Sequence, residues 1–149
     1  MPLPKVVLVP TDFSESSDAA LSYAMSIAAA TIGGRIVLLH AYATPVVAFP
    51  TGAMAYVPEI ISNIVRQAED ELLKRAERVK GAGVAVETSL KNGDPRDSVL
   101  LAIDEFHADM VCMGTRGRRG IAHMLIGSVA ESVVRTSKVP VLTVHRPAT

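Results

Sequence analysis

Glycines, arginines and a serine gather late in the chain at a spacing that suits a phosphate. Gly114-Thr115-Arg116-Gly117 is followed by nine residues and then by Gly127-Ser128. Glycine lets the backbone turn tightly and lets a ligand approach without a side chain in the way. Gly127-Ser128 precedes a helical pattern, and the free amides and positive dipole end of a helix start favour phosphate. The segment therefore predicts an anion site, although it matches neither the P-loop nor the dinucleotide Gly-x-Gly-x-x-Gly motif.

A second group of candidate residues follows the first apolar run of the chain. Pro10-Thr11-Asp12 comes directly after Val6-Val7-Leu8-Val9. The Asp12 carboxylate could accept hydrogen bonds from ribose hydroxyls or from a Mg²⁺-bound water. It could equally cap the next helix, because Glu15 stands three residues later, and Ser128 with Glu131 repeats that capping pattern. For both Asp12 and Ser128, helix capping is therefore an alternative to ligand binding.

Residues for other kinds of chemistry are missing or poorly spaced. The four histidines have no metal-ligand spacing, and no Gly-x-Ser-x-Gly elbow supports a hydrolase. The single cysteine, Cys112, cannot form an internal disulfide, and its apolar surroundings indicate an inert core residue. We expect no catalytic residue and no metal ligand.

Short apolar runs alternate with stretches of helical period, which places the candidate residues at the ends of strands. We expect strands at residues 6–9, 36–39, 84–90, 110–113 and 139–144. We expect helices at residues 15–31, 59–80, 95–107 and 128–136. Strands separated by helices predict right-handed crossovers and an open parallel sheet with helices on both faces. The sequence thus predicts one α/β domain over residues 1–149, with ligands at the carboxyl ends of the strands.

The segment at residues 36–58 carries no charged side chain. It is long enough to span a bilayer, but three prolines and a glycine interrupt it. We interpret it as a buried strand followed by an apolar loop. Phe49, Met54 and Tyr56 of this loop could cover a ligand, face a partner or pack onto their own domain.

The charge balance limits the partners that the chain can bind. Fifteen basic residues match fifteen acidic ones, so the net charge is zero. That argues against broad electrostatic binding to nucleic acid or to an acidic membrane, and it opposes self-association only weakly. The start of the chain does not read as a signal peptide, and a single cysteine fits a reducing compartment, so we expect a cytoplasmic protein.

The motifs together resemble the universal stress protein family over essentially the whole chain. The matching segments are Gly-x2-Gly-x9-Gly-Ser from Gly114, Pro10-Thr11-Asp12-Phe13-Ser14, Leu38-Leu39-His40, Gly127-Ser128-Val129-Ala130-Glu131 and Val139-Pro140-Val141-Leu142. The resemblance implies a five-stranded Rossmann-like sheet of order 3-2-1-4-5. In ATP-binding members it also implies an adenine nucleotide lying across strands one and four.

Carried onto this chain, the resemblance assigns Asp12 and the backbone of Ala41 to the adenosine part. It assigns the motif glycines, Ser128 and the amide of Val129 to ribose and phosphates. Arg116, Arg118 and Arg119 could pair with phosphate only where a guanidinium faces the pocket, and otherwise form a solvated loop. The residues expected at the site are Pro10, Thr11, Asp12, Ala41, Gly114, Thr115, Arg116, Gly117, Arg118, Gly127, Ser128 and Val129.

The expected function is therefore an ATP-binding universal stress protein that acts as a stress sensor or regulatory module, with or without Mg²⁺. A nucleotide-independent interaction protein of the same fold and a slow ATPase remain the alternatives. An FMN protein is disfavoured, because the chain has no tryptophan and few aromatics to stack on a flavin. The apolar strand from Val139 to Val144, at one edge of the expected sheet, predicts a homodimer, which the resemblance also implies.

Overall fold

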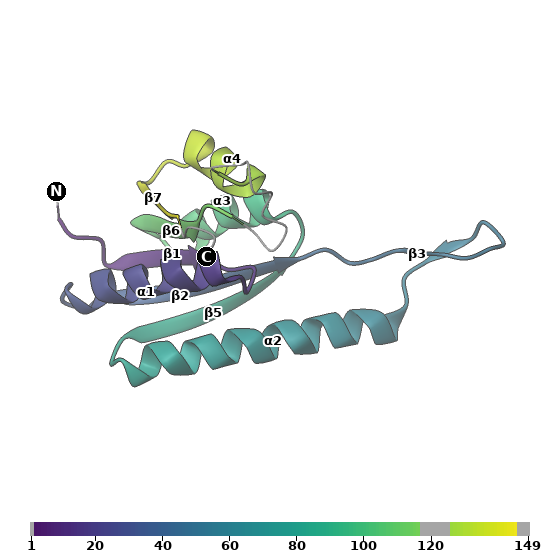
Figure 1. Cartoon of the computed structure of the whole chain (residues 1–149), viewed down its shortest axis with the longest axis horizontal. Helices are drawn as coiled ribbons and strands as arrows, with labels where there is room; N and C mark the ends of the chain where they lie inside the picture. The colour runs from purple at the N-terminus through teal and green to yellow at the C-terminus, as the bar shows by residue number, and fades with distance from the viewer. Residues whose placement is uncertain (1, 117–125, 146–149) are drawn as a thin grey trace.

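The apolar runs pair into one parallel sheet in a computed structural model that describes residues 2–116 and 126–145. Its strands are β1 (Val6–Pro10), β2 (Arg35–Tyr42), β5 (Ala85–Asn92), β6 (Met110–Gly114) and β7 (Val141–Val144). They lie in the order β5-β2-β1-β6-β7, and every pair is parallel (Figure 1). Counted along the chain, this is the order 3-2-1-4-5, so the predicted fold class and topology are confirmed.

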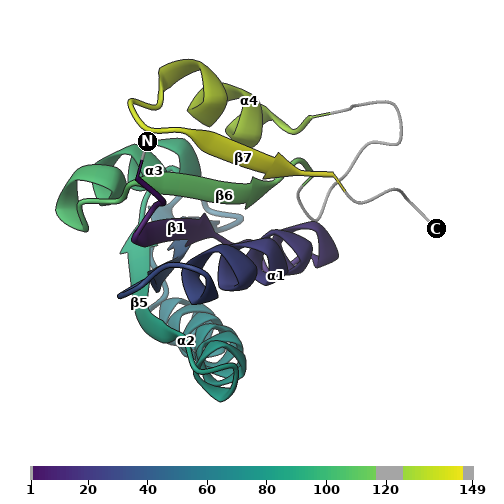
Figure 2. The ribbon, with the colours of Figure 1, turned by 90° about the vertical axis from the view of Figure 1, so that its left-hand side faces the viewer.

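Helices cover both faces of the sheet. They are α1 (Glu15–Ala29), α2 (Pro58–Gly81), α3 (Pro95–Glu105) and α4 (Ser128–Thr136). α1 and α2 bury apolar side chains against one face, whereas α3 and α4 cover the other (Figure 2). Because both faces are covered, the central strands β1 and β6 are continuously apolar, as parallel strands require.

The centre of the sheet brings two predicted loops to one place. Leu8 of β1 pairs with Val111 of β6. Continuing that register to the strand ends sets Thr11 level with Gly114. The chain runs from β1 toward β2 on one side and reaches β6 on the other, so the strand order reverses here. Parallel sheets bind ligands in the crevice at such a reversal.

The apolar loop after β2 is not the irregular segment that the sequence predicts. Two short strands, β3 (Val47–Ala48) and β4 (Met54–Ala55), pair antiparallel in it. Gly52 closes the turn at φ 83°, and the Phe49 amide donates to the Ala53 carbonyl at 2.8 Å. The turn chemistry of Pro50-Thr51-Gly52 is the signal that the sequence interpretation passed over.

We call residues 43–57 the arm, because they project beyond the sheet (Figure 1). None of them is buried. Asn92 at the end of β5 donates to the Thr44 hydroxyl at 2.7 Å and fixes the base of the arm. The arm leads into α2, whose first ten residues, 58–67, contain no buried side chain either. Only the second half of α2 covers the sheet.

Candidate functional site

The turn after β1 is built by short polar side chains that satisfy one another. The buried Thr11 hydroxyl lies 3.0 Å from the Ser17 hydroxyl and accepts the Phe13 amide at 3.0 Å. Asp12 is half-buried, and its carboxylate accepts the Ser14 amide at 3.0 Å. Asp12 therefore orders its own turn rather than capping α1. The cap is Ser14, whose hydroxyl accepts the Ser17 amide at 3.2 Å, so the capping alternative for Asp12 is wrong.

The two ends of the glycine motif meet beyond β6. The Gly127 amide donates to the carbonyl of Thr115, which joins the start of α4 to the end of β6. The Thr115 amide in turn donates to the Val144 carbonyl at 3.1 Å, and the Thr115 hydroxyl lies 3.2 Å from Nδ1 of His145. β6, the start of α4 and the end of β7 are thus tied together at the carboxyl edge of the sheet.

Gly114 is required by close packing rather than by an unusual backbone angle. A Cβ built there would lie 2.5 Å from the Ser16 hydroxyl and 2.8 Å from the Ser16 carbonyl carbon. The backbone of β6 therefore touches the first turn of α1. Any larger residue would separate the two loops that flank the crevice.

The first turn of α4 has no side-chain cap from its N-cap residue. Its N-cap residue is Gly127, which has no side chain to accept a hydrogen bond from the first helical amides. Ser128 is the first helical residue and is exposed. Ser128 therefore does not cap the helix, so the structural alternative for this residue is wrong. Uncapped amides and the helix dipole together favour a negative group.

Arg116 is the site residue with an unsatisfied polar atom. Its backbone amide lies 3.4 Å from the Ser16 hydroxyl, and the residue is half-buried. Within residues 2–116 and 126–145, its buried Nε atom has no hydrogen-bond partner. A buried N–H without a partner is costly, and an anion beside it would remove that cost.

The remaining predicted residues fall into three groups. Pro10 ends β1, and Ala41 lies half-buried near the end of β2, next to β1. Val129 packs against the core beneath α4, which leaves its backbone amide in the first turn. Gly117 and Arg118 lie outside the described residues.

Arg75 of α2 is the site-building residue that sequence reasoning missed. Its guanidinium holds the Asp18 carboxylate with two hydrogen bonds, of 2.7 and 3.0 Å, and donates to the Phe13 carbonyl at 3.3 Å. It also donates to the Glu71 carboxylate at 2.7 Å. The contact with Phe13 spans 62 residues of sequence, and no local motif marks it. The sequence around it shows only an arginine within an amphipathic helix.

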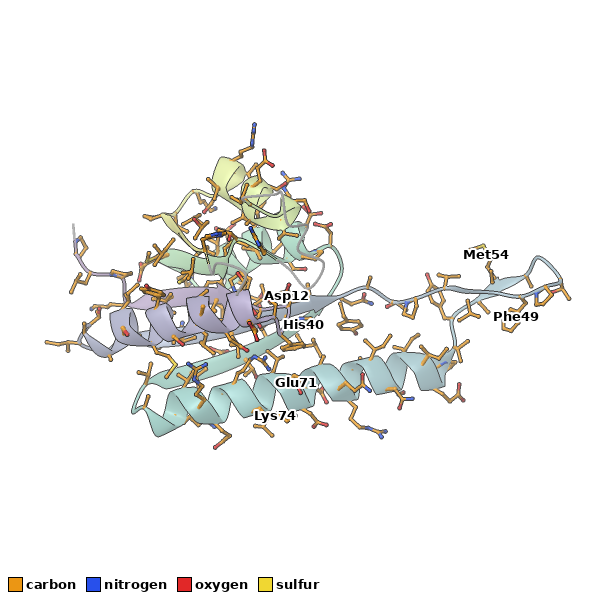
Figure 3. All side chains as sticks on the ribbon, in the orientation of Figure 1. Asp12, His40, Phe49, Met54, Glu71 and Lys74 are labelled. Carbon is orange, nitrogen blue, oxygen red and sulfur yellow. The ribbon has the colours of Figure 1, made fainter. Side chains whose placement is uncertain are left out.

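The Phe13 ring links Arg75 to the end of β2. Phe13 has a positive φ of 66°, a strained angle for a bulky residue. Its ring stacks on the His40 ring at 4.3 Å, while the Arg75 guanidinium lies 4.9 Å from the ring centroid on a cation–π contact. His40 Nδ1 lies 2.7 Å from the Thr11 carbonyl. α2 and β2 thus hold the turn that carries Asp12 (Figure 3).

A cavity of about 510 Å³ opens beside this cluster, between α2 and the ends of the central strands. Phe13 and His40 form its inner wall, and its outer wall consists of Ile64, Gln67, Ala68, Asp70, Glu71 and Lys74 from α2. The turn that holds Asp12 therefore has open space on its α2 side.

Charges around Arg75 compensate one another. Hydrogen bonds from Lys74 and then from Arg75 lower the pKa of Glu71 to about 2. Burial alone would lower the pKa of Arg75, but its hydrogen bonds to Asp18 and Glu71 outweigh burial and raise it. Glu71 and Arg75 therefore stay ionised at neutral pH. In the core, burial raises the pKa of Cys112 to about 11, which keeps it a thiol.

Two absences hold for the part of the chain that the structure describes. No three His, Cys, Asp or Glu side chains there come together as metal ligands. No helix there is both long and apolar enough to cross a bilayer.

Comparison with known proteins identifies the family of this chain. The family model for universal stress proteins matches residues 4–145. The chain belongs to the universal stress protein family. Universal stress protein YxiE of Bacillus subtilis is 33% identical over 145 residues, covering 93% of this chain and 97% of that protein.

Solved structures of universal stress proteins share the fold over almost the full length. The structure of MJ0577 from Methanocaldococcus jannaschii aligns with a TM-score of 0.84 at 22% identity, covering 99% of each chain. A crystal structure of a universal stress protein in complex with cAMP aligns with a TM-score of 0.70 at 32% identity. That alignment covers 96% of this chain and 98% of the other. The family therefore includes a similar chain that binds an adenine nucleotide.

Proposed function

We propose that this universal stress protein binds an adenine nucleotide, ATP in the first instance, and acts as a sensor or regulatory module of the stress response. The observation that carries the proposal is the hydrogen bond from the Gly127 amide to the Thr115 carbonyl. It gathers Gly114, Arg116 and the uncapped start of α4 beside the Asp12 turn. The cAMP complex of a similar chain supports the same ligand class.

The residues fit the parts of a nucleotide. Phosphate oxygens accept hydrogen bonds, and the first amides of α4 together with Arg116 Nε are donors that lack protein partners among the described residues. The Asp12 carboxylate is an acceptor, which suits ribose hydroxyls or a Mg²⁺-bound water. Ala41 offers backbone groups to the adenine edge. In this proposal the protein binds and orients the phosphates and takes no part in a reaction.

Mass spectrometry of nucleotide released from protein purified without added ligand tests the proposal. We expect an adenine nucleotide in the eluate. Calorimetry then compares the unaltered protein with Gly117→Val, which puts a branched side chain into the glycine motif and should abolish binding. Gly81→Val is the matched control, because a Cβ at Gly81 meets nothing within 4 Å. Equal ATP affinity in all three proteins would refute the assignment.

Two further parts of the proposal concern the setting of the protein. We assign it to the cytoplasm and to a homodimer joined through β7. Among residues 2–116 and 126–145, β7 is an edge strand that pairs with β6 on one side only. Its outer backbone groups are thus available to a second chain, although Pro140, just before it, lacks an amide proton.

A further inference from the structure

The arm exposes an unusual amount of apolar surface. Residues 43–57 contain no charged side chain. Within and just after the arm, the exposed fraction is 43% for Val46, 44% for Phe49, 69% for Met54, 64% for Tyr56 and 40% for Ile60. A large apolar side chain has about 200 Å² of surface, so together they present on the order of 500 Å². Single patches of that size on a monomer are often functional.

The hairpin cannot be stable through its own contacts. β3 and β4 share two residue pairs, and they pair only with each other. An isolated two-stranded hairpin is marginal in water even when it is longer. Yet the Asn92–Thr44 bond and the closed turn at Gly52 give the arm one defined shape. The arm is therefore a built element whose apolar side chains lack a covering surface among the described residues.

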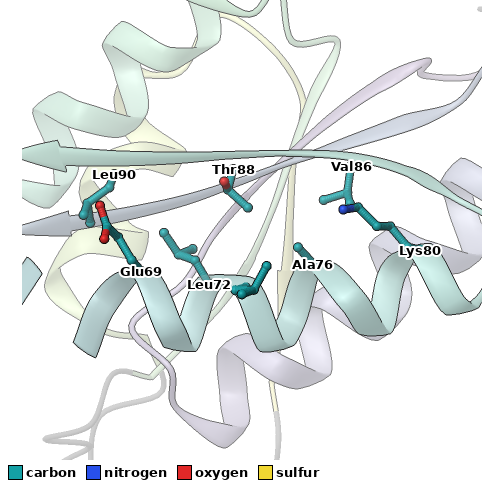
Figure 4. A pocket seen from close by; sticks show the side chains of 8 residues that line it. Glu69, Leu72, Ala76, Lys80, Val86, Thr88 and Leu90 are labelled. Atoms are coloured by element: carbon teal, nitrogen blue, oxygen red, sulfur yellow. The ribbon is translucent and has the colours of Figure 1, made fainter. Parts of the chain in front are cut away.

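A matching surface lies between α2 and the edge strand β5. There a cleft of about 470 Å³ is lined mainly by apolar side chains (Figure 4). Its floor and walls are Leu72, Leu73, Ala76, Val86, Thr88 and Leu90, with Glu69 and Lys80 completing the lining. Leu73 is 56% exposed. The cleft is wide enough for two or three large side chains. In the part of the chain that the structure describes, β5 ends the sheet, so no further strand lies beside the cleft.

The arm of a chain points away from that chain's own cleft. The cleft begins at Glu69, about 16 Å along α2 from Pro58 at 1.5 Å per residue. β2 continues directly into the arm, and the arm extends away from the sheet (Figure 1). The arm therefore cannot reach the cleft of its own chain. Because both surfaces are apolar, the arm of one copy complements the cleft of a second copy.

We propose that the arm of one copy of this protein buries Phe49, Met54 and Tyr56 in the α2–β5 cleft of a second copy, which returns its own arm in the same way. At about 200 Å² per side chain, Phe49, Met54 and Tyr56 of two arms bury on the order of 700 Å². The two clefts bury about as much again, which reaches the size of a specific interface. The absence of charge on the arm and the zero net charge of the chain remove the repulsion that would oppose like copies. The surface is separate from the nucleotide site and from β7.

Cross-linking between two differently tagged copies tests this exchange. One carries Met54→Cys and the other Thr88→Cys, and both keep Cys112, which is buried and stays a thiol. After mixing and mild oxidation we expect a mixed-tag disulfide dimer. The matched control pairs Met54→Cys with Tyr23→Cys, an exposed position on α1. Mixed dimers at no more than the control level would overturn the proposal.

Sedimentation separates this interface from other assemblies. Met54→Asp with Tyr56→Asp places charge on exposed side chains, so the fold should persist while one association step is lost at micromolar concentration. Leu142→Glu on β7 should leave that step in place. An unchanged mass for the arm variant contradicts the exchange. Co-flotation of the unaltered protein with phosphatidylcholine vesicles, abolished by the arm variant, would instead assign the arm to a lipid surface and also overturn it.

Discussion

At the scale of single residues, the candidate site depends on side chains that hold backbone as much as on side chains that could touch a ligand. Asp12 accepts the Ser14 amide, and Phe13 adopts a positive φ in the same turn. Arg75 holds that turn from α2 through the Phe13 carbonyl and ring. A strained angle persists only where its surroundings enforce it. Arg75 and the stacked His40 supply that enforcement.

Asp12→Ala should weaken nucleotide binding by about 1–3 kcal/mol, because a hydrogen bond to a charged acceptor is lost. Isothermal titration calorimetry measures the change. Ser14→Ala is the matched control, since it removes the helix cap and costs about 0.5–2 kcal/mol of stability without touching a carboxylate. If both variants lose the same affinity, Asp12 only orders the turn.

Arg75→Lys should weaken binding several-fold at an unchanged stoichiometry. Lysine keeps the positive charge but loses the two-pronged hold on Asp18 and the contact with the Phe13 carbonyl. The melting temperature should fall as well, because Arg75 is largely buried, with a side chain 13% exposed. Lys74→Met serves as the control, since that side chain is 71% exposed and its pair with Glu71 contributes little. Unaltered affinity in Arg75→Lys would show that α2 does not position the site.

At the scale of elements, the crevice depends on how closely β6 approaches α1. The first turn of α1 carries Ser16 and Ser17, both buried, where a larger side chain would push the helix outward. β6 ends at Gly114, which has no side chain to fill the contact with Ser16. The start of α4 then closes on β6 through Gly127 and Thr115. Three elements converge because small residues, Ser16, Gly114 and Gly127, stand at their contacts.

Gly114→Ala should destabilise the fold by about 1–3 kcal/mol through overpacking. Two of the three nearest atoms belong to the Ser16 backbone, so Ser16→Ala should not restore stability. Urea unfolding followed by circular dichroism measures the loss, with Gly81→Ala as the control in open space. A midpoint equal to that of the control would mean that α1 shifts without cost.

At the scale of the whole molecule, the alternation of short apolar runs with stretches of helical period was enough to predict the parallel sheet. α4 was predicted with its observed bounds, Ser128–Thr136, and the order of strands followed from the family resemblance. The arm was missed because β3 and β4 are each two residues long, too short for a period to register. The Arg75 contact was missed because it joins residues far apart in sequence. The Arg75 contact is a tertiary feature that no local pattern encodes, whereas the arm has one local signal, the turn residues Pro50-Thr51-Gly52.

Assembly through β7 is tested by Leu142→Glu and Val141→Glu. The two side chains are half-buried against opposite faces of their own domain, Leu142 on the α1 side and Val141 on the α3–α4 side. A charge on either should disfavour packing by a second strand and shift light scattering toward a lower mass. Tyr23→Glu, on exposed α1 surface, should leave the mass unchanged. A monomeric unaltered protein at micromolar concentration would refute the β7 dimer.

If two copies exchange arms as proposed, the uncharged arm also ties the lifetime of the protein to its abundance. A copy without a partner presents fifteen consecutive residues with no charge and none buried. Such extended, accessible segments are what proteases cut first. A copy whose arm is covered escapes cleavage, so dilution should speed degradation and accumulation should slow it. A cell that raises synthesis would thereby gain more protein than the added synthesis alone provides.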